Sequence, residues 1–424
     1  MQETFLHYIW QSRSLDFCQL KTTQDEPIKI QQFGHHNENA GPDFLEAKIS
    51  LSDVIWSGSV EMHIKSSMWH QHNHDADPAY ENVILHVVWE HDQEILHRDG
   101  QIIPCVQLRD FVDQELIEKY DLLTHQISEF PCHYALPKVA VFQQQAMLEK
   151  SAIERLQQKA TVVFEILQQV NYDWEEVSFR MMLTGFGMKV NKSPMIRLGE
   201  TLPYKYLKKH ADQPLLVEAL LFGQAGMLNK VSDHYGEELF NHYRFLAHKY
   251  ELSTSLQRPQ WKFSRLRPIN FPTIRLAQLA QLFAKHPQLF DSILHLTQLK
   301  EITSLFNISA SRYWLSHYDF GKNWSKETTT LIGKNMIHHL IINVFAPILV
   351  AASQYFDEQQ SMDKAIQWLE AIPTESNKIT RKFEKMMFPV VNAMDSQGCL
   401  SLYYNYCLKK NCLRCNIGTA ILKS

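Results

Sequence analysis

The pattern of apolar and polar residues changes near Val112. Between about Ile28 and Leu108, short segments rich in β-branched and aromatic residues are separated by turn-forming residues, a pattern typical of strands. Asp99-Gly100 lies between two of these apolar runs, and both residues tolerate positive φ, so we expect a hairpin there. The region predicts a sheet that contains antiparallel pairs.

After Val112 the apolar residues recur with helical spacing, most clearly from Val139 to Val170. Further helices are expected at 214–222, 237–250, 273–286 and 334–350. We therefore predict an α+β fold: residues 1–125 form a mixed or mainly antiparallel β domain, and residues 126–424 form a large helical domain.

The composition is that of a globular protein with no large excess of either charge. Lys and Arg number 42 against 46 Asp and Glu, a net charge of −4, so a site for a polyanion has to be a local patch. The first residues lack the features of a secretory signal, and the longest apolar run, near 341–352, is interrupted by Asn343 and Pro347. We expect a cytoplasmic protein without a membrane span, and the sequence leaves its oligomeric state open.

Several segments resemble those of one protein family. They are GPDF (41–44), GSVEMHIKSSMWHQHNHDADPAYENVILHVV (58–88), EALLFGQAGML (218–228), RLRPINFPTIRLAQLAQL (265–282) and YCLKKNCLRCNIG (406–418). The sequence is similar to bacterial proteins that share a domain of unknown function numbered 2851, over nearly the whole chain. The resemblance implies a bacterial, cytoplasmic protein and brings no established activity.

Asp43, Glu61, His63 and Lys65 are the first candidate for a catalytic site. Side chains alternate between the faces of a strand, so the last three share one face, and Asp43 near a neighbouring strand can meet them. An aspartate followed by Glu-x-Lys on the next strand resembles the motif of restriction-endonuclease-like nucleases, whose carboxylates hold magnesium and whose lysine positions water. Here His63 takes the lysine position, and Lys65 is two residues farther on. We expect Asp43, Glu61 and His63 to bind Mg²⁺ or Mn²⁺, and Lys65 or His63 to orient or deprotonate water. The alternative is a solvent-facing sheet surface with incidental charges.

Histidines are concentrated in the same region, at positions 63, 70, 72, 74, 86, 91 and 97. His72 and His74, followed by two aspartates, offer nitrogen and oxygen ligands suited to zinc, iron or manganese. Alternatively, these two histidines cap a turn. His86 lies inside an apolar strand and is expected to be structural.

Four of the seven cysteines, Cys399, Cys407, Cys412 and Cys415, are close together in the sequence. Four thiolates can bind zinc or hold an iron–sulfur cluster, and the C-x-x-C spacing of the last two suits both. We expect a metal centre with a structural role, and ordinary reduced thiols are the alternative.

A basic stretch without Asp or Glu extends from Leu252 to Phe290. It combines aromatic residues with basic residues that we expect on an exposed nucleic-acid-binding surface, namely Lys262, Arg265, Arg267 and Arg275. Alternatively, the arginines pair with carboxylates between helices.

Together these features favour a metal-dependent nuclease or phosphodiesterase that acts on nucleic acid. The main alternative is a non-enzymatic module that binds nucleic acid or protein. A third is a small-molecule metalloenzyme that uses His72 and His74. The motifs of α/β-hydrolases, dinucleotide-binding proteins and zinc proteases do not occur in the sequence.

Overall fold

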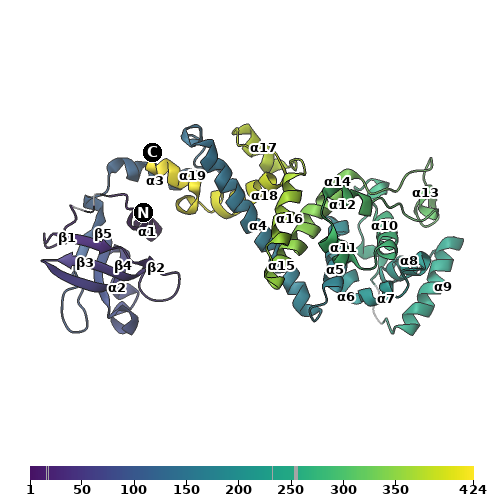
Figure 1. Cartoon of the computed structure of the whole chain (residues 1–424), viewed down its shortest axis with the longest axis horizontal. Coiled ribbons are helices and arrows are strands. Elements are labelled where there is room, and N and C mark those ends of the chain that lie inside the picture. The colour runs from purple at the N-terminus through teal and green to yellow at the C-terminus, as the bar shows by residue number, and fades with distance from the viewer. Residues whose placement is uncertain (16, 18, 232, 253–255) are drawn as a thin grey trace. The chain divides into compact units, whose positions relative to one another are not determined.

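The structure, a computed structural model, describes every residue of the chain except 16, 18, 232 and 253–255, so Cys18 lies outside the described residues. Its contacts divide the chain into two compact units, each visible in Figure 1. Residues 1–147 and 402–424 form the sheet unit, and residues 148–401 form the helical unit. The predicted α+β class is confirmed.

The C-terminal segment belongs to the sheet unit. The sequence analysis had placed the boundary between the two domains at residue 125 and had assigned this segment to the helical domain. Helix α19 (Asn416–Lys423) packs against α3 (Gln114–His125). Both helices bury apolar residues, among them Leu123 of α3 and Ile421 of α19. The C-terminal helix therefore completes the core of the sheet unit, although the helical unit separates the two in sequence.

The sheet unit is built around one mixed sheet (Figure 1). Its strands are β1 (Ile28–Gln32), β2 (His35–His36), β3 (Phe44–Leu51), β4 (Val54–Lys65), β5 (Val83–Glu90) and β6 (Cys105–Gln107). The order is β1-β3-β4-β5-β6, with β2 paired to β3. The first three strands of that order are antiparallel, whereas β4, β5 and β6 run parallel.

Two tight turns shape this sheet. Ser52 and Asp53 both adopt left-handed conformations, with φ of 46° and 64°, and join β3 directly to β4. The predicted turn at Asp99-Gly100 is present as well, with Gly100 at φ 86° and an antiparallel bridge between Leu96 and Ile102. Both turns use residues that tolerate positive φ.

Helices and short helical turns cover this sheet. Helix α1 (Glu3–Ser12) packs on β4, and its residues Phe5, Leu6, Ile9 and Trp10 are fully buried. The crossover from β4 to β5 contains α2 (Met68–Gln71) and the turns η1 (His74–Ala76) and η2 (Pro78–Tyr80). The remaining turns of the unit are η3 (Leu108–Asp110), η4 (Leu136–Lys138), the π-helix η8 (Leu402–Cys407) and η9 (Cys412–Arg414).

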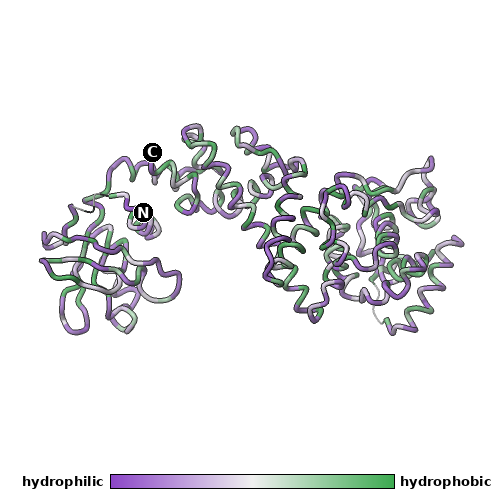
Figure 2. Tube along the Cα trace, in the orientation of Figure 1, coloured by the Kyte–Doolittle hydropathy of each residue, from purple (hydrophilic) through white to green (hydrophobic). Residues whose placement is uncertain are grey.

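The helical unit begins inside the long helix α4 (Val141–Gln169). Figure 2 shows hydrophobic stretches along its inner helices and hydrophilic residues in its outer loops. Its helices are α5 (Trp174–Gly187), α6 (Lys192–Thr201), α7 (Tyr204–Lys208), α8 (Pro214–Gln224), α9 (His234–Lys249), α10 (Pro272–Lys285), α11 (Leu289–His295), α12 (Leu299–Leu305), α13 (Tyr313–Ser316), α14 (Lys334–Leu340), α15 (Ala346–Phe356), α16 (Gln360–Glu370), α17 (Lys378–Lys385) and α18 (Ala393–Ser401). A small hairpin, β7 (His317–Asp319) with β8 (Lys322–Asn323), follows α13.

The apolar run near residue 341 lies in the core of the helical unit. Helices α14 and α15 are joined there by a π-helix, η7 (Ile341–Phe345), into one helical stretch, Lys334–Phe356. Among the described residues this stretch has the length and apolar character of a membrane span, but 83% of its most apolar window is buried inside the unit. Such burial is typical of a core helix.

Candidate metal centre

Asp43 and Glu61 lie next to each other on neighbouring strands. Asp43 directly precedes β3, and because Phe44 pairs with Val60, Asp43 is opposite Glu61 of β4. The Asp43 N–H donates to Glu61 Oε2 at 3.1 Å, and the Met62 N–H donates to Asp43 Oδ2 at 2.9 Å. These reciprocal hydrogen bonds hold both carboxylates in one place.

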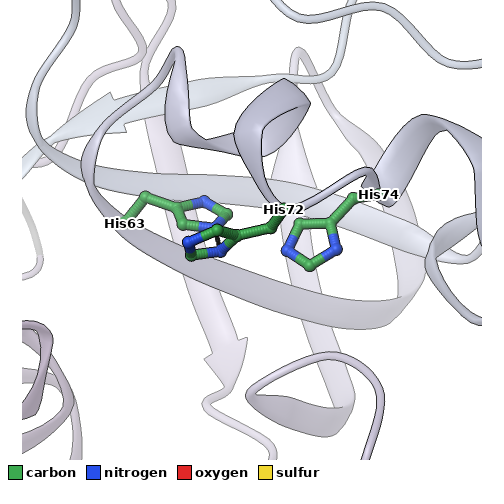
Figure 3. Close-up of side chains that lie close together, drawn as sticks. All are labelled: His63, His72 and His74. Atoms are coloured by element: carbon green, nitrogen blue, oxygen red, sulfur yellow. Dashed lines mark hydrogen bonds between the residues drawn. The ribbon is translucent and has the colours of Figure 1, made fainter.

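Three imidazoles, those of His63, His72 and His74, gather beside this pair (Figure 3). One ring nitrogen of each lies within 4.8 Å of a ring nitrogen of the other two. His63 Nε2 is 3.1 Å from His72 Nδ1 and 3.6 Å from Glu61 Oε1, which is 3.3 Å from His74 Nε2. Two nitrogen ligands at about 2.05 Å from a tetrahedral ion are about 3.3 Å apart. The three measured separations therefore suit the edges of such a site.

The crossover from β4 to β5 presents two of these imidazoles to the third. His72 directly follows α2, and Asn73 adopts a left-handed conformation (φ 59°) that turns the chain between His72 and His74. The His74 ring stacks on that of Tyr80, with centroids 3.7 Å apart. His63 lies two residues beyond Glu61 on β4 and shares its face of the sheet.

Burial shifts the pKa values of His63 and Glu61 in this cluster. It lowers the pKa of His63 to about 2, and the neighbouring imidazoles act in the same direction. Burial raises the pKa of Glu61, whose side chain is 6% exposed, and the negative charge of Asp43 raises it further. His63 is therefore neutral, with a lone pair available to a cation. A cation bound here would offset the charge of Glu61.

His86 of β5 orients His63 from the other side of the ring. His63 Nδ1 and His86 Nε2 are 2.9 Å apart, and His86 is fully buried. Burial lowers the pKa of His86 to about 3, so this imidazole is neutral as well. A hydrogen bond at one ring nitrogen fixes the direction of the other, as is usual for histidines that bind metals.

Helix α1 contributes Glu3 and His7, which the sequence analysis missed. They are four residues apart and share one face of the helix. His7 Nε2 is 3.2 Å from Asp43 Oδ2, and burial, assisted by Asp43, raises the pKa of Glu3. Among the described residues, Glu3 Oε1 is buried without a hydrogen-bond partner, and the equally buried His7 Nε2 and His74 Nε2 face the carboxylate oxygens of Asp43 and Glu61 at 3.2 and 3.3 Å without hydrogen-bonding geometry. Buried polar atoms are normally satisfied, so these atoms fit a cluster that binds a cation.

Lys65 lies apart from the cluster, although it follows His63 on the same face of β4. It is the last residue of the strand and is paired in register with Glu90 of β5. Its Nζ is 3.6 Å from Glu90 Oε1, and both side chains are about half exposed, at 49% and 48%. The expected role of Lys65 in acting on water therefore has no geometric support.

A cavity of about 370 Å³ adjoins the cluster through His7, which lines the cavity and contacts Asp43. The other lining residues come from α1, from His36, from the end of α3 and from the C-terminal segment. Lys409 and Arg414 are among them, and the described lining contains no Asp or Glu. The cavity therefore has a positive lining suited to an anion.

The helical unit contains a larger cavity, of about 490 Å³. Lys159 lies in its wall and donates to Asn343 Oδ1 at 3.0 Å and to Gln397 Oε1 at 2.7 Å. Its described lining holds one carboxylate, Glu200, and one imidazole, His339. This cavity therefore lacks a donor set comparable to that of the sheet unit.

The cysteines that were expected to share one metal belong to different units. Cys399 is buried in α18 of the helical unit, whereas Cys407, Cys412 and Cys415 are in the sheet unit. A further cysteine of the sheet unit, Cys132, has its pKa raised to about 12 by burial and by the neighbouring Cys415 and Cys412. The same three cysteines raise the pKa of Cys407 in addition to burial.

The basic stretch is only partly exposed. Lys262, Arg265 and Arg267 are exposed. Arg275, in contrast, is 8% exposed in α10 and donates to two side-chain oxygens of neighbouring residues at 2.7 and 2.8 Å. The expectation of an exposed Arg275 is wrong, because the first half of α10 is packed into the core of the helical unit.

The chain is thus an α+β protein whose sheet unit carries a buried cluster of carboxylates and imidazoles. Residues 3–378 match the family described as "Protein of unknown function (DUF2851)", and the chain belongs to that family. No curated protein matches the chain, and no solved structure does. Its function has to be argued from the site itself.

Proposed function

We propose that this protein is a metal-dependent hydrolase of phosphodiester bonds, with nucleic acid as its substrate class. The observation that carries the proposal is the spacing of the ligand atoms of Glu61, His63, His72 and His74, with separations of 3.1, 3.3 and 3.6 Å that suit one tetrahedral ion. Incidental surface charge is a poor alternative, because the side chains of Glu61 and His63 are 6% and 1% exposed. Buried ionisable groups of this kind are costly and concentrate at functional sites.

The donor set favours a transition metal over magnesium. Mg²⁺ prefers oxygen ligands and retains several waters, whereas Zn²⁺ and Mn²⁺ accept imidazole nitrogen. We therefore place Zn²⁺ or Mn²⁺ in this proposal, held by Glu61 and the three histidines. When bound, such an ion would extend its coordination beyond these four ligands to admit a water, which it would make a better nucleophile, and would polarise a phosphoryl oxygen.

Asp43 and His7 are suited to moving a proton. Their side chains are 23% and 19% exposed, so both are more accessible than Glu61. A carboxylate next to an imidazole orients the ring and stabilises its protonated form. We propose that His7 exchanges a proton with the attacking water or the leaving oxygen, and that Asp43 orients His7.

Positive charge beside the cluster supports an anionic substrate. Lys409 and Arg414 line the cavity that His7 borders, and guanidinium groups match the geometry of phosphate oxygens. The exposed Lys262, Arg265 and Arg267 of the helical unit offer a second basic surface for a polyanion. The proposal assigns the backbone of nucleic acid to these groups.

The cluster has the two carboxylates of the restriction-endonuclease-like motif but not its lysine. Asp43 and Glu61 take the two carboxylate positions, and their reciprocal hydrogen bonds keep them together. The lysine position holds the buried His63, and Lys65 pairs with Glu90 instead. The proton transfer of the reaction therefore falls to His7 in this proposal.

The test uses purified full-length protein that is freed of metal by a chelator and then supplied with Mg²⁺, Mn²⁺ or Zn²⁺. The substrates are single- and double-stranded DNA, RNA and a chromogenic aryl phosphodiester. We expect cleavage with Mn²⁺ or Zn²⁺ and a loss of roughly 100-fold or more in Asp43→Asn and Glu61→Gln. Glu90→Gln is the matched control, because it makes the same chemical change on the same sheet outside the cluster.

Three results would contradict the proposal in different ways. Binding of nucleic acid without cleavage under any metal would favour a binding module. Cleavage of the small diester alone would favour a small-molecule metalloenzyme. Cleavage that persists in Glu61→Gln would assign the activity to another site.

A further inference from the structure

The cavity of about 490 Å³ in the helical unit is walled mainly by four helical segments, namely α4, α5, α6 and the continuous stretch of α14, η7 and α15. On α4 the lining residues are three or four positions apart, so they form one stripe along the helix, and α6 contributes a similar stripe. Every lining residue lies between positions 155 and 347, so the cavity belongs to one compact unit. Its volume is within the range of small-molecule sites, roughly 300–1,000 Å³.

Two basic side chains of α4, Arg155 and Lys159, lie side by side in the wall of this cavity. Arg155 Nε and Lys159 Nζ donate to the same oxygen, Gln397 Oε1, at 2.8 and 2.7 Å. Gln397 Nε2 donates in turn to a carboxylate oxygen of Glu375, and neither Gln397 nor Glu375 is in the described lining. The negative charge of Glu375 therefore acts on the two cations across a neutral amide.

The hydrogen bonds of Lys159 are complete, but its charge is not balanced. Its other two bonds go to the Ile342 carbonyl oxygen at 3.1 Å and to Asn343 Oδ1 at 3.0 Å, both in the π-helix η7. All three acceptors are neutral, and in the described part of the chain no carboxylate forms an ion pair with this ammonium. Burial, assisted by the charge of Arg155 and opposed to a smaller extent by Glu375, lowers the pKa of Lys159 to about 7. Buried charges are normally paired, so an anion in the cavity would stabilise the charged form of Lys159.

The other charged residues of the lining largely cancel. Arg180 Nε is 3.0 Å from Glu176 Oε1, and the two groups form an ion pair. Lys192 and Glu200 are both exposed and have opposite charges. The positive character of the cavity is therefore concentrated around Lys159.

Much of the remaining lining is aliphatic. Val162, Met188 and Ile196 are 47%, 43% and 38% exposed, and they come from three different parts of the wall. Exposed apolar side chains that gather around one cavity are typical of a site that binds an apolar group. The described lining contains no Phe, Tyr or Trp, so it suits an alkyl chain better than a nucleobase, which would stack on such rings.

We propose that this cavity binds an aliphatic amphiphile with an anionic head group, either a carboxylate or a phosphate. The head group lies beside Lys159 and Arg155 and offsets the charge of the lysine, and the alkyl chain covers the exposed aliphatic side chains. Because Lys159 also donates to η7, a bound head group acts on a π-helix, an element that is frequent at functional sites. The site does not depend on the proposed hydrolase function, because all of its residues belong to the helical unit.

The experiment measures the binding of decyl phosphate, decanoate, decanol and inorganic phosphate to the full-length protein by isothermal titration calorimetry, with each amphiphile below its micelle concentration. We expect one molecule of decyl phosphate or decanoate per chain. Decanol lacks the charge and inorganic phosphate lacks the chain, so both should bind about 10-fold more weakly or worse. The two acids distinguish a phosphate from a carboxylate head group, and tighter binding of either one supports the proposal.

Lys159→Met keeps the length of the side chain and removes its charge, so it should weaken the binding of both acids by about 10-fold and leave that of decanol unchanged. Lys150→Met is the matched control, because it makes the same change at an exposed lysine of α4 outside the cavity. If Lys159→Met does not fold, Ile196→Glu and Ile196→Gln decide, because this side chain is exposed and a carboxylate there would repel the head group. The glutamate variant should then bind the acids more weakly than the glutamine variant.

Three results would overturn the proposal. Decanol that binds as tightly as the acids would exclude an anionic head group, and inorganic phosphate that binds as tightly would exclude the alkyl chain. Unchanged affinity in Lys159→Met, or equal affinities of the two Ile196 variants, would exclude this cavity as the site. A protein that binds none of the four compounds would refute the proposal as a whole.

Discussion

Replacing Glu61 with glutamine should separate the stability of the metal-free protein from its response to metal. Glu61 is buried, and burial and Asp43 raise its pKa, so its ionised form is unfavourable in the folded state without a cation. Glutamine keeps an oxygen that can accept the Asp43 N–H and removes the charge. We therefore expect metal-free Glu61→Gln to be at least as stable as the wild type.

The response to metal should be the opposite. An ion present at 100 times its dissociation constant stabilises the folded state by about 2.7 kcal/mol. The melting temperature of a unit of 150–250 residues changes by roughly 2–4 °C for each kcal/mol, so the wild type should gain roughly 5–10 °C. Glu61→Gln lacks one of the four proposed ligands and should gain almost nothing at the same ion concentration.

Differential scanning calorimetry of the full-length protein, with and without Zn²⁺ or Mn²⁺, measures both effects. Glu90→Gln is the control and should retain the full gain, because Glu90 pairs with Lys65 at the exposed end of the sheet. An equal gain in Glu61→Gln would refute the ligand assignment. A metal-free variant that is several kcal/mol less stable would show instead that Glu61 is an ordinary structural partner of its neighbours.

Three further predictions concern single residues. Lys65→Ala should leave diester hydrolysis nearly unchanged, because its ammonium pairs with Glu90; a 100-fold loss would return the lysine to a catalytic role. Arg414→Ala should raise KM and reduce the salt dependence of nucleic-acid binding by about one unit of slope, and an unchanged slope would remove Arg414 from the phosphate contacts. Burial raises the pKa of Glu218 in the helical unit from 4.5 to about 7, so its stabilising contribution is complete below about pH 4.5 and is lost as pH rises through about 7. Between these pH values the free energy of unfolding should fall by about 3 kcal/mol. Denaturant titrations at several pH values should show that this pH dependence disappears in Glu218→Gln. An unchanged pH dependence in the variant would contradict the assignment to Glu218.

Local patterns were enough to predict the parts of the fold and site that depend on neighbouring residues. The alternation of side chains along β4 places Glu61 and His63 on one face, and the β3–β4 hairpin brings Asp43 to them. The turn at Asp99-Gly100 follows from residues that accept positive φ. These features are encoded within a few residues of each other or across a single short turn.

The rest depends on packing between distant segments, which one sequence does not reveal. Glu3 and His7 reach the cluster only because α1 packs on β4, although their four-residue spacing in an apolar helix was a usable signal. Cys132 is separated from the other cysteines of the sheet unit by the whole helical unit. Arg275 resembles its basic neighbours in sequence and differs from them because α10 turns that residue into the core.

The most direct test of the metal centre is anomalous diffraction from crystals of the full-length protein grown with Mn²⁺ or Zn²⁺. We predict an anomalous peak about 2.0–2.2 Å from Glu61 and from ring nitrogens of His63, His72 and His74, with the hydrogen bond between His63 and His72 replaced by two bonds to the ion. The proposed metal centre would be contradicted if the cluster shows no anomalous peak at saturating metal and His63 Nε2 and His72 Nδ1 remain hydrogen-bonded to each other.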